Sequence, residues 1–400
     1  MLFSRASRLT VKTPVAAKLE PRHAETNGFK MPDKKQCKIF YFLHDLAPFG
    51  AQRAVLYAVK NIDKAAFSVF VCSLWHEETM KADFENAGAK VVLLRAKRFF
   101  DIFAWLRLVT TLKRLRPDII HTTIPELGVI VRFLKFILPG TKIVHTFQNP
   151  LSSETSFWRS LNAKTIGLCD FVTFASLGIV TEVLDAAPVI KSKYAVIQNS
   201  VTLNEHSGQK SDIRKEFKID ASARLLVCNG RLTRQKGQEF LIDALNILAD
   251  KGLNLKLMLV GDGDQLDYFK QRTVNLGLTD SVIFAGRRMD IPSILQAADI
   301  YAAASRWESF NIALGEAMLA GLPCVASDIP GHKDLAENHK TAILVKAENS
   351  ADTAAAIEWI LEHAEESKTI AETAKKRVAE EFTPEKMGRK YQDLYLSLCK

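Results

Sequence analysis

Residues 305–323 read SRWESFNIALGEAMLAGLP and place two glutamates, Glu308 and Glu316, around the start of an expected helix. Ser309 is a capping residue type, which predicts that the helix begins near the phenylalanine that follows it. Gly321, with a proline two residues later, is predicted to end the helix. A carboxylate among apolar neighbours is costly unless a partner satisfies it, and a helix N-terminus binds anions. Sugar and ribose hydroxyls are donors that would satisfy both carboxylates.

Length and composition allow two domains of ordinary size. The chain has 400 residues, 48% of them hydrophobic, so each domain can bury a core. No apolar run reaches the ~18 residues that a membrane-spanning helix needs. The cysteines form no CxxC pair, and several lie in strand-like runs. This predicts reduced, structural thiols of a cytosolic protein and neither a disulfide framework nor a zinc site. The cysteines are Cys37, Cys72, Cys169, Cys228, Cys324 and Cys399.

From Cys37 onward, short strand-like runs alternate with longer amphipathic ones, which predicts parallel sheets with helices on both faces. The expected strands of the first half are 38–43, 68–74, 90–94, 118–121, 142–146, 171–174 and 195–197, with helices such as 51–61 and 157–168 between them. Those of the second half are 224–228, 255–260, 282–284, 300–303, 324–327 and 343–345. The polar stretch 199–210 between the halves predicts a linker.

This alternation predicts an α/β fold of two doubly wound domains in tandem, the first over 37–200 and the second over 201–383. Ligands of open α/β sheets bind at the carboxyl ends of the strands, so two such domains would share a cleft, and the cleft is the expected site. After 350 the chain is helical by its period, and Pro384 begins a final helix.

Residues 1–36 are basic and have no strong periodicity within a chain of net charge +9. Three interpretations compete: a disordered basic arm, a transit-like peptide, or an extension ahead of a true start at Met31. We favour the disordered segment. The stretch has no apolar core of the kind that a signal peptide contains.

A second basic region, 95–116, mixes cations with Phe and Trp on an expected helix, and 131–138 repeats the mixture. Such a segment can lie on the headgroups of an anionic bilayer. The alternative is an ordinary helix that buries its aromatic residues and leaves its cations in solvent. We expect no nucleic-acid partner, because no recognised nucleic-acid motif accompanies the charge.

The loop after the strand 224–228 carries two cations between two glycines. Gly230 and Gly237 suit a tight strand-to-helix turn. Arg231 and Lys236 then lie at the carboxyl edge of the sheet, where they can neutralise a diphosphate and stabilise it as a leaving group. The alternative is that both are ordinary surface cations of a loop.

Two further loops follow strands of the second half. Asp262 and Asp264 have the spacing of cation ligands, but Gly261 marks a turn and Asp264 is predicted to cap the next helix. No acid or histidine cluster supports a cation there, so no metal site is expected. In the next loop, Gly286 and Arg287 would let backbone approach a nucleobase, and a plain turn is equally consistent.

Five segments, in this order and spacing, resemble the family 4 glycosyltransferases. They are Gly230-Arg231…Lys236-Gly237, Val260–Gly263, Phe284–Gly286, Ser305…Pro323 and Ser327–Gly331. The resemblance covers residues 37–400 and is strongest in the second half. It implies a retaining, metal-free enzyme of the two-domain GT-B fold. It also implies that the last helix, 384–400, crosses back and completes the first domain.

The resemblance also implies roles for individual residues. Glu316 resembles the glutamate that holds the ribose hydroxyls, and Glu308 the one that contacts the donor sugar near its reacting carbon. Arg231 and Lys236 resemble the pair that steadies the departing diphosphate. The phosphates would meet the backbone amides at the helix start: Phe310, Asn311 and Ile312. The other expected donor-side positions are Gly50, Gly230, Gly261, Gly286 and Arg287.

The first half departs from the family pattern. The stretch FGAQR at 49–53 stands where many relatives have Gly-Gly-x-Glu-Arg, so that Gly50 and Arg53 are kept. Gln148 stands where relatives often carry a histidine that faces the donor sugar. His145 and His121 are nearby in sequence. Each is either a residue of the acceptor or donor-sugar side or a satisfied core residue on its strand.

The sequence therefore predicts a cytoplasmic glycosyltransferase of the hexosyltransferase type that uses a nucleotide sugar and no cofactor or metal. The region 95–116 motivates peripheral attachment to the cytoplasmic face of the inner membrane. It also motivates a lipid-linked or cell-envelope glycan acceptor, of the lipopolysaccharide, capsule or exopolysaccharide type. Two alternatives remain: a GT-B nucleotide-sugar epimerase, and a non-catalytic sugar-nucleotide sensor or scaffold.

Overall fold

The computed structural model describes residues 36–203 and 212–399. All but the last residue of the basic segment 1–36, and most of the linker 199–210, fall outside these residues. Within them, every expected strand is present, and its ends lie within two residues of the expected ones.

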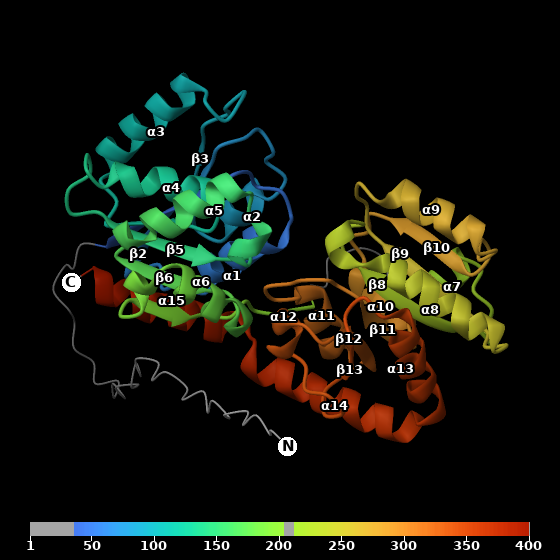
Figure 1. The fold of residues 1–400 in the computed structure, drawn as a ribbon. Coiled ribbons are helices and arrows are strands. Elements are labelled where there is room, and N and C mark those ends of the chain that lie inside the picture. Colours follow the sequence, from blue (N-terminus) through green and yellow to red (C-terminus); the bar gives the residue numbers. More distant parts are fainter. Residues whose placement is uncertain (1–35, 204–211, 400) are drawn as a thin grey trace, which may run out of the picture. The chain divides into compact units, whose positions relative to one another are not determined.

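The first half forms a seven-stranded parallel sheet in the order β3-β2-β1-β4-β5-β6-β7 (Figure 1). This is the strand order of a doubly wound nucleotide-binding fold with one strand added. The strands are β1 (Cys37–Leu43), β2 (Phe67–Ser73), β3 (Lys90–Leu93), β4 (Ile119–Thr122), β5 (Lys142–Phe147), β6 (Phe171–Phe174) and β7 (Tyr194–Val196).

Helices cover both faces of this sheet, because successive residues of a strand point to opposite sides. Phe40 and Phe42 of β1 pack in one core with α3, α4 and α6, whereas Ile39 and Tyr41 pack in another with α1 and α2. The helices are α1 (Gly50–Lys60), α2 (Lys81–Asn86), α3 (Ile102–Leu115), α4 (Pro125–Leu134), α5 (Ser156–Thr165) and α6 (Val180–Ala186).

The second half repeats the plan with a six-stranded parallel sheet in the order β10-β9-β8-β11-β12-β13. The strands are β8 (Arg224–Asn229), β9 (Leu255–Val260), β10 (Val282–Gly286), β11 (Ile300–Ala303), β12 (Cys324–Ser327) and β13 (Ile343–Val345). The helices are α7 (Ile213–Glu216), α8 (Gln238–Asp250), α9 (Leu266–Asn275), α10 (Ile291–Ala297), α11 (Ile312–Ala320), α12 (Pro330–Lys333), α13 (Ser350–Glu362) and α14 (Ala364–Glu381).

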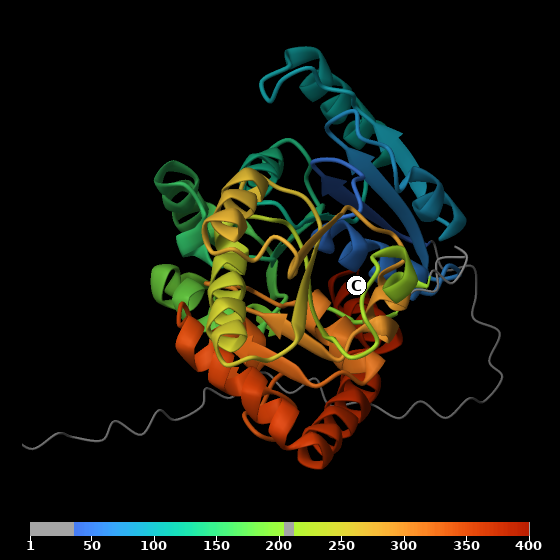
Figure 2. The ribbon, with the colours of Figure 1, turned by 90° about the vertical axis from the view of Figure 1, so that its right-hand side faces the viewer.

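These helices also divide between two cores. Buried residues of α8, α9 and α13 share one with the sheet, those of α10 and α11 share the other, and α14 contributes to both. Figure 2 shows helices of this half, coloured yellow to red, around its sheet. The chain thus builds two Rossmann-like domains, as the alternation of short apolar and amphipathic runs predicted.

The last helix, α15 (Pro384–Leu398), packs on the first sheet and its helix α1. Thr383 caps it by accepting a hydrogen bond from Lys386 N, and Pro384 occupies the first turn, where no amide partner is lost. The Tyr395 hydroxyl lies 2.6 Å from that of Tyr41 and 2.6 Å from His121 Nδ1, in the centre of that core. The crossing of the terminal helix to the first domain is confirmed.

The prediction of six reduced cysteines is wrong for one pair. Cys37 and Cys399 form a disulfide, while Cys72, Cys169, Cys228 and Cys324 are free and buried. Cys37 begins β1 and Cys399 follows α15, so the two sulfurs meet only because the final helix returns to the first sheet. The two cysteines are 362 positions apart in the sequence, and nothing in the intervening sequence indicates that they meet. No helix within 36–203 and 212–399 is both long and apolar enough to cross a membrane.

Candidate active site

A cavity of about 440 Å³ opens at the carboxyl ends of strands from both sheets. The loops after β1 and β5 line it from the N-terminal domain, and those after β8 and β11 line it from the C-terminal domain. An adjoining lobe of about 430 Å³ shares Arg53, Arg231 and Glu316 with it and extends to the loops after β9 and β10. The site therefore lies where the topology of doubly wound sheets predicts it.

Helix α11 starts at this cavity, but Ser309 is not its cap. Asn311 caps the helix, and its Oδ1 accepts a hydrogen bond from Leu314 N at 3.2 Å. The Phe310 side chain is buried against Phe382, which keeps Phe310 outside the helix and moves the cap past it. The Ser309 hydroxyl is buried without a partner. Gly321, at φ 84°, ends the helix as predicted.

The first amides of α11 lack intrahelical acceptors, and the N-terminus of a helix carries a partial positive charge. Phe310, Asn311, Ile312 and Ala313 all line the cavity. The Ile312 amide donates to the carbonyl of Phe310 at 3.1 Å. Helix α1 also begins at this cavity, with Gly50 in its wall, so two helix N-termini converge on one space.

Glu308 and Lys236 meet in the cavity although 72 residues separate them. Lys236 Nζ lies 2.5 Å from Glu308 Oε1, and the Ser305 hydroxyl donates to the same oxygen at 2.9 Å. Glu308 is 8% exposed, so its charge would be costly without these two partners. Lys236 reaches it from the loop after β8, and Gly230 and Arg231 of that loop also line the cavity.

Glu316 is the more poorly satisfied carboxylate. It lies in the middle of α11, is 9% exposed, and has Arg53 Nη1 at 3.8 Å across the cavity. Burial raises its pKa to about 7, although Arg53 and a hydrogen bond from Asn229 act in the opposite direction. Desolvation therefore outweighs these two partners, and further hydrogen-bond donors would favour the ionised form.

The three glycine loops of the C-terminal domain are held together by backbone contacts. A Cβ on Gly261 would overlap the carbonyl oxygen of Gly230, so only glycine fits at φ 138° there. The Gly261 amide donates to the carbonyl of Gly286 at 2.8 Å. Gly261 and Arg287 line the second lobe. Gly286 does not line it and is joined to it through its hydrogen bond with Gly261. The guanidinium of Arg287 lies 5.9 Å from the centre of the Phe49 ring.

The prediction that Asp264 caps the next helix is wrong. The cap position of α9 is Gln265, and no side chain caps that helix. The loop is instead held by backbone bonds, in which Leu232 N donates to Asp262 O and Gln265 N donates to Leu232 O. Among the residues that the structure describes, no group of three or more His, Cys, Asp or Glu side chains is arranged to hold a metal.

The wall from the N-terminal domain is largely uncharged. Gln148 lines the cavity, and its Oε1 accepts a hydrogen bond from Asn199 Nδ2 at 3.0 Å. Asn149 and Asn199 line the cavity as well, and Arg53 is the cation of this wall.

The structure places His121 and His145 in the sheet and not on the wall of either lobe. His121 Nε2 lies 2.6 Å from Thr146 Oγ1, and His145 Nδ1 lies 2.9 Å from Thr122 Oγ1. Burial lowers the pKa of His121 to about 3 and that of His145 well below its ordinary value. Both are buried, neutral residues of the first sheet. His121 has a partner on each ring nitrogen, as expected of a satisfied core histidine, whereas the Nε2 atom of His145 is buried without a hydrogen-bond partner.

Sequence reasoning missed three asparagines of the wall. Asn149, Asn199 and Asn229 all line the cavity, and Asn229 also hydrogen-bonds Glu316. Each lies at or just after the carboxyl end of a strand: β5, β7 and β8. Attention to polar residues at strand ends would have found them.

Two family models match this chain. Glycosyltransferase Family 4 matches residues 49–205, and Glycosyl transferases group 1 matches residues 209–377. The chain belongs to the family 4 glycosyltransferases. The two matched regions correspond to the two Rossmann-like domains, and the carboxyl ends of both sheets contribute to the cavity.

Relatives of this chain include a synthase and a galactosyltransferase. The chain is 24% identical to the N-acetyl-alpha-D-glucosaminyl L-malate synthase of Bacillus anthracis, over 75% of this chain and 80% of that protein. It is 26% identical to the UDP-Gal:alpha-D-GlcNAc-diphosphoundecaprenol alpha-1,3-galactosyltransferase of Escherichia coli, over 62% of this chain and 67% of that protein.

The fold is shared with Anabaena Alr3699/HepE, whose structure in complex with UDP-glucose superposes with a TM-score of 0.78 at 23% identity. The superposition covers 90% of this chain and 99% of HepE. The glycosyltransferase described here therefore has the GT-B architecture.

Proposed function

We propose that this glycosyltransferase moves a sugar from a nucleoside diphosphate to an acceptor, with retention of configuration at the sugar. The observation that carries the proposal is Glu316, a buried carboxylate in the same cavity as the Lys236–Glu308 pair and the start of α11, whose pKa is raised by burial. Ribose hydroxyls would donate to it and favour its ionised form. HepE, which shares the fold, has been crystallised with UDP-glucose.

In this proposal, each part of the donor lies beside cavity residues whose charge or hydrogen-bonding groups complement it. The ribose would contact Glu316, and the diphosphate would lie at the N-termini of α11 and α1. Arg231 and Lys236 supply positive charge there, and the transferred sugar would lie beside Glu308. The base would occupy the second lobe, near Gly261 and Arg287.

Catalysis then depends on charge stabilisation. The bond between the sugar carbon and the diphosphate oxygen breaks, positive charge grows at the sugar, and negative charge grows on the diphosphate. Two cations and two helix N-termini line the cavity where that charge would develop, so they would stabilise it in the transition state. The proposal involves no metal and no cofactor.

For the acceptor we propose a lipid-linked or cell-envelope glycan reached from an anionic membrane surface. The support is an exposed apolar region on α3, α4 and the residues just before and after these helices. Phe100, Ile102 and Phe103 are 78%, 65% and 72% exposed, while the opposite side of α3 is buried through Ala104, Leu108 and Leu112.

The region also includes exposed apolar residues of α3 and at or just after the end of α4, and exposed cations before and within α3. The further apolar residues are Leu106, Phe133, Phe136 and Ile137, and the cations are Lys97, Arg98, Lys113 and Arg114. We name this set of residues the basic apolar surface. Aromatic residues next to cations suit the headgroup layer of an anionic bilayer. The name of the Escherichia coli relative contains a diphosphoundecaprenol-linked acceptor, which agrees with this choice.

The test combines binding and transfer. The purified chain is screened against UDP-, GDP- and ADP-sugars by thermal shift, and the sugar that stabilises it is then offered with lipid-linked acceptors. We expect one nucleotide class to raise the melting temperature, because a saturating ligand at 100 times its Kd stabilises by about 2.7 kcal/mol. Consumption of donor without acceptor would instead indicate an epimerase, and binding without turnover a sensor. No stabilisation by any nucleotide sugar would contradict the proposal.

A further inference from the structure

Outside the cavity, the contact of Asp334 with the N-terminal domain stands out. Asp334 is 5% exposed and belongs to the C-terminal domain, directly after α12. Its carboxylate accepts hydrogen bonds from the Ser176 hydroxyl, from Leu177 N at 3.2 Å and from Gln198 Nε2 at 2.9 Å. All three donors belong to the N-terminal domain, so one buried side chain joins the two halves of the enzyme.

The N-terminal side of this contact is a tight turn. Ser176 caps the 3-10 helix η3 (Leu177–Ile179), and its hydroxyl oxygen accepts a bond from Gly178 N while donating to Asp334. A Cβ on Gly178 would overlap Pro330, the first residue of α12. The turn η3 and helix α12 are therefore in direct contact as well as hydrogen-bonded.

Helix α12 also contacts the segment that carries Glu308 and the Asn311 cap of α11. A Cβ on Gly331 would overlap the carbonyl oxygen of Glu308, so the two backbones touch. His332 is fully buried; its Nε2 accepts from Asn311 Nδ2 at 2.9 Å, and its Nδ1 donates to the carbonyl of Ser327 at 2.8 Å. Burial lowers the pKa of His332 to about 4, which keeps the ring neutral and these roles fixed. Asn311 is the cap of α11.

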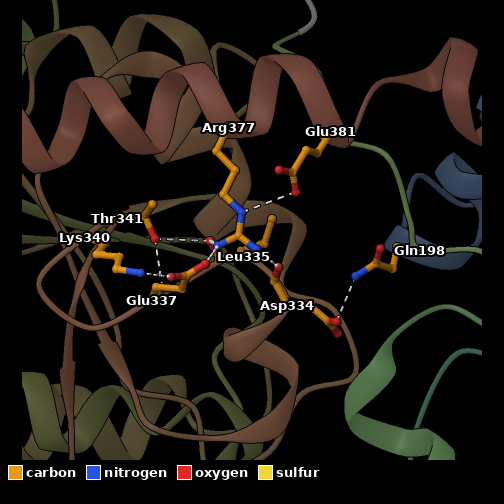
Figure 3. Close-up of polar contacts among 8 residues, drawn as sticks. All are labelled: Gln198, Asp334, Leu335, Glu337, Lys340, Thr341, Arg377 and Glu381. Atoms are coloured by element: carbon orange, nitrogen blue, oxygen red, sulfur yellow. Dashed lines mark hydrogen bonds and ion pairs between the residues drawn. The ribbon is translucent and has the colours of Figure 1, made fainter. Parts of the chain in front are cut away.

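Helix α14 also contacts the segment after α12, through hydrogen bonds from Arg377. Arg377 on α14 donates to the carbonyls of Asp334 and Leu335 and to the carboxylate of Glu337 (Figure 3). Gln198 approaches Asp334 from the N-terminal domain in the same view. The turn that carries Asp334 thus has fixed contacts on both sides, and a shift of η3 would be passed on through α12.

We infer that Asp334 is a positioning residue for transfer: through α12 it sets Glu308 and the Asn311 cap relative to the cavity wall of the N-terminal domain. The inference rests on the proposed function, because it supposes that the donor lies between those two walls. Asp334 lines neither lobe, so it acts without touching the donor. A misplacement of about 1 Å in a reacting geometry costs on the order of 100-fold in rate.

The test compares Asp334→Ala and Asp334→Asn with Lys333→Ala. Lys333 lies on the same helix, and its exposed pair with Asp328 (2.7 Å) stays within the C-terminal domain, so this variant is the matched control. We expect Asp334→Ala to lower kcat roughly 10- to 100-fold while the Kd of the nucleoside diphosphate changes less than about twofold. Asp334→Asn keeps an acceptor for Leu177 N or Gln198 and should restore much of kcat, and Lys333→Ala should match the wild type.

Hydrogen exchange gives a readout that does not need transfer. Asp334→Ala should speed amide exchange at 176–179 and also at 308–314, whereas Lys333→Ala should change neither segment. Faster exchange at 176–179 alone, with kcat intact, would overturn the inference, and so would equal losses of kcat and nucleotide affinity. A wild-type chain that neither binds nor turns over any nucleotide sugar would refute the proposed function instead. The exchange pattern would still report whether Asp334 couples the two segments.

Discussion

The two walls of the cavity are built differently. The C-terminal wall holds fixed charges and closely joined backbone: the Lys236–Glu308 pair, Glu316, and the contact of Gly230 with Gly261. The N-terminal wall offers amides and a helix start, with Arg53 as its cation. A nucleoside diphosphate has the same charges whichever sugar it carries, whereas acceptors differ. In the proposed function, the C-terminal wall would therefore hold the nucleoside diphosphate, which is the same in every transfer, and the N-terminal wall would face the acceptor.

The largest expected effect comes from the charged pair of the C-terminal wall. Lys236→Ala removes a cation from the diphosphate site and leaves Glu308 buried without its ion-pair partner, so kcat should fall by about 100-fold or more. Steady-state transfer assays measure this. The matched control is Lys251→Ala, which breaks an exposed pair with Glu358 of 2.6 Å and should leave kcat unchanged. Equal activity of the two variants would contradict the role of Lys236.

Glu316→Gln should have the next largest effect, on binding. The amide cannot accept two charged hydrogen bonds from ribose, so donor affinity should weaken by about 1.5–3 kcal/mol, or roughly 10- to 150-fold. Isothermal titration with the nucleoside diphosphate measures the loss. An unchanged Kd would contradict the assignment of Glu316 to the nucleoside site.

The raised pKa of Glu316 predicts a pH dependence of binding. Its pKa is about 7 in the free protein, and ribose donors favour the ionised form, so affinity should fall as the pH drops below 7. Glu316→Gln should lose this dependence. A wild-type affinity that is flat between pH 8 and pH 6 would contradict the assignment.

The same shift has a consequence for stability, with the opposite sign. Folding raises the pKa of Glu316 from 4.5 to about 7. Glu316 therefore contributes to the free energy of unfolding fully below pH 4.5, and this contribution is lost as the pH rises through about 7. Bound nucleotide should offset the loss. The thermal shift caused by nucleotide should therefore grow from pH 6 to pH 8, and a shift that shrinks would argue against ribose at Glu316.

The smallest expected effect concerns the basic apolar surface of the N-terminal domain. The double variant Phe100→Ser and Phe103→Ser should bind anionic vesicles roughly five- to tenfold more weakly, because two exposed aromatic contacts are lost. Nucleotide affinity should not change. Val274→Ser, which removes an exposed apolar residue from α9, is the control and should bind vesicles like the wild type. Equal vesicle binding by all three proteins would refute the membrane role.

The C-terminal wall was also the easier one to predict. Its strands are continuous apolar runs between turn glycines, and the rule for carboxyl strand ends predicts that Lys236 lies at the cleft edge of the sheet. The cap of α11 was misassigned because Ser309 and Asn311 are both capping types, and only the burial of Phe310 decides between them.

Features that depend on long-range packing left no local signal. The Cys37–Cys399 disulfide exists because α15 returns to β1. Asp334 belongs to no motif, and its partners come from two separate loops of the other domain. The histidines of the first sheet were placed among candidates because sequence alone does not show that Tyr395 and Thr146 satisfy His121.

The most direct test of the donor site is a crystal structure with the nucleoside diphosphate that stabilises the chain most. The account predicts both ribose hydroxyls within about 3.2 Å of the Glu316 carboxylate. It also predicts the β-phosphate at the start of α11, beside Lys236. A nucleotide bound elsewhere, or bound in the cavity with its ribose away from Glu316, would contradict the central claim.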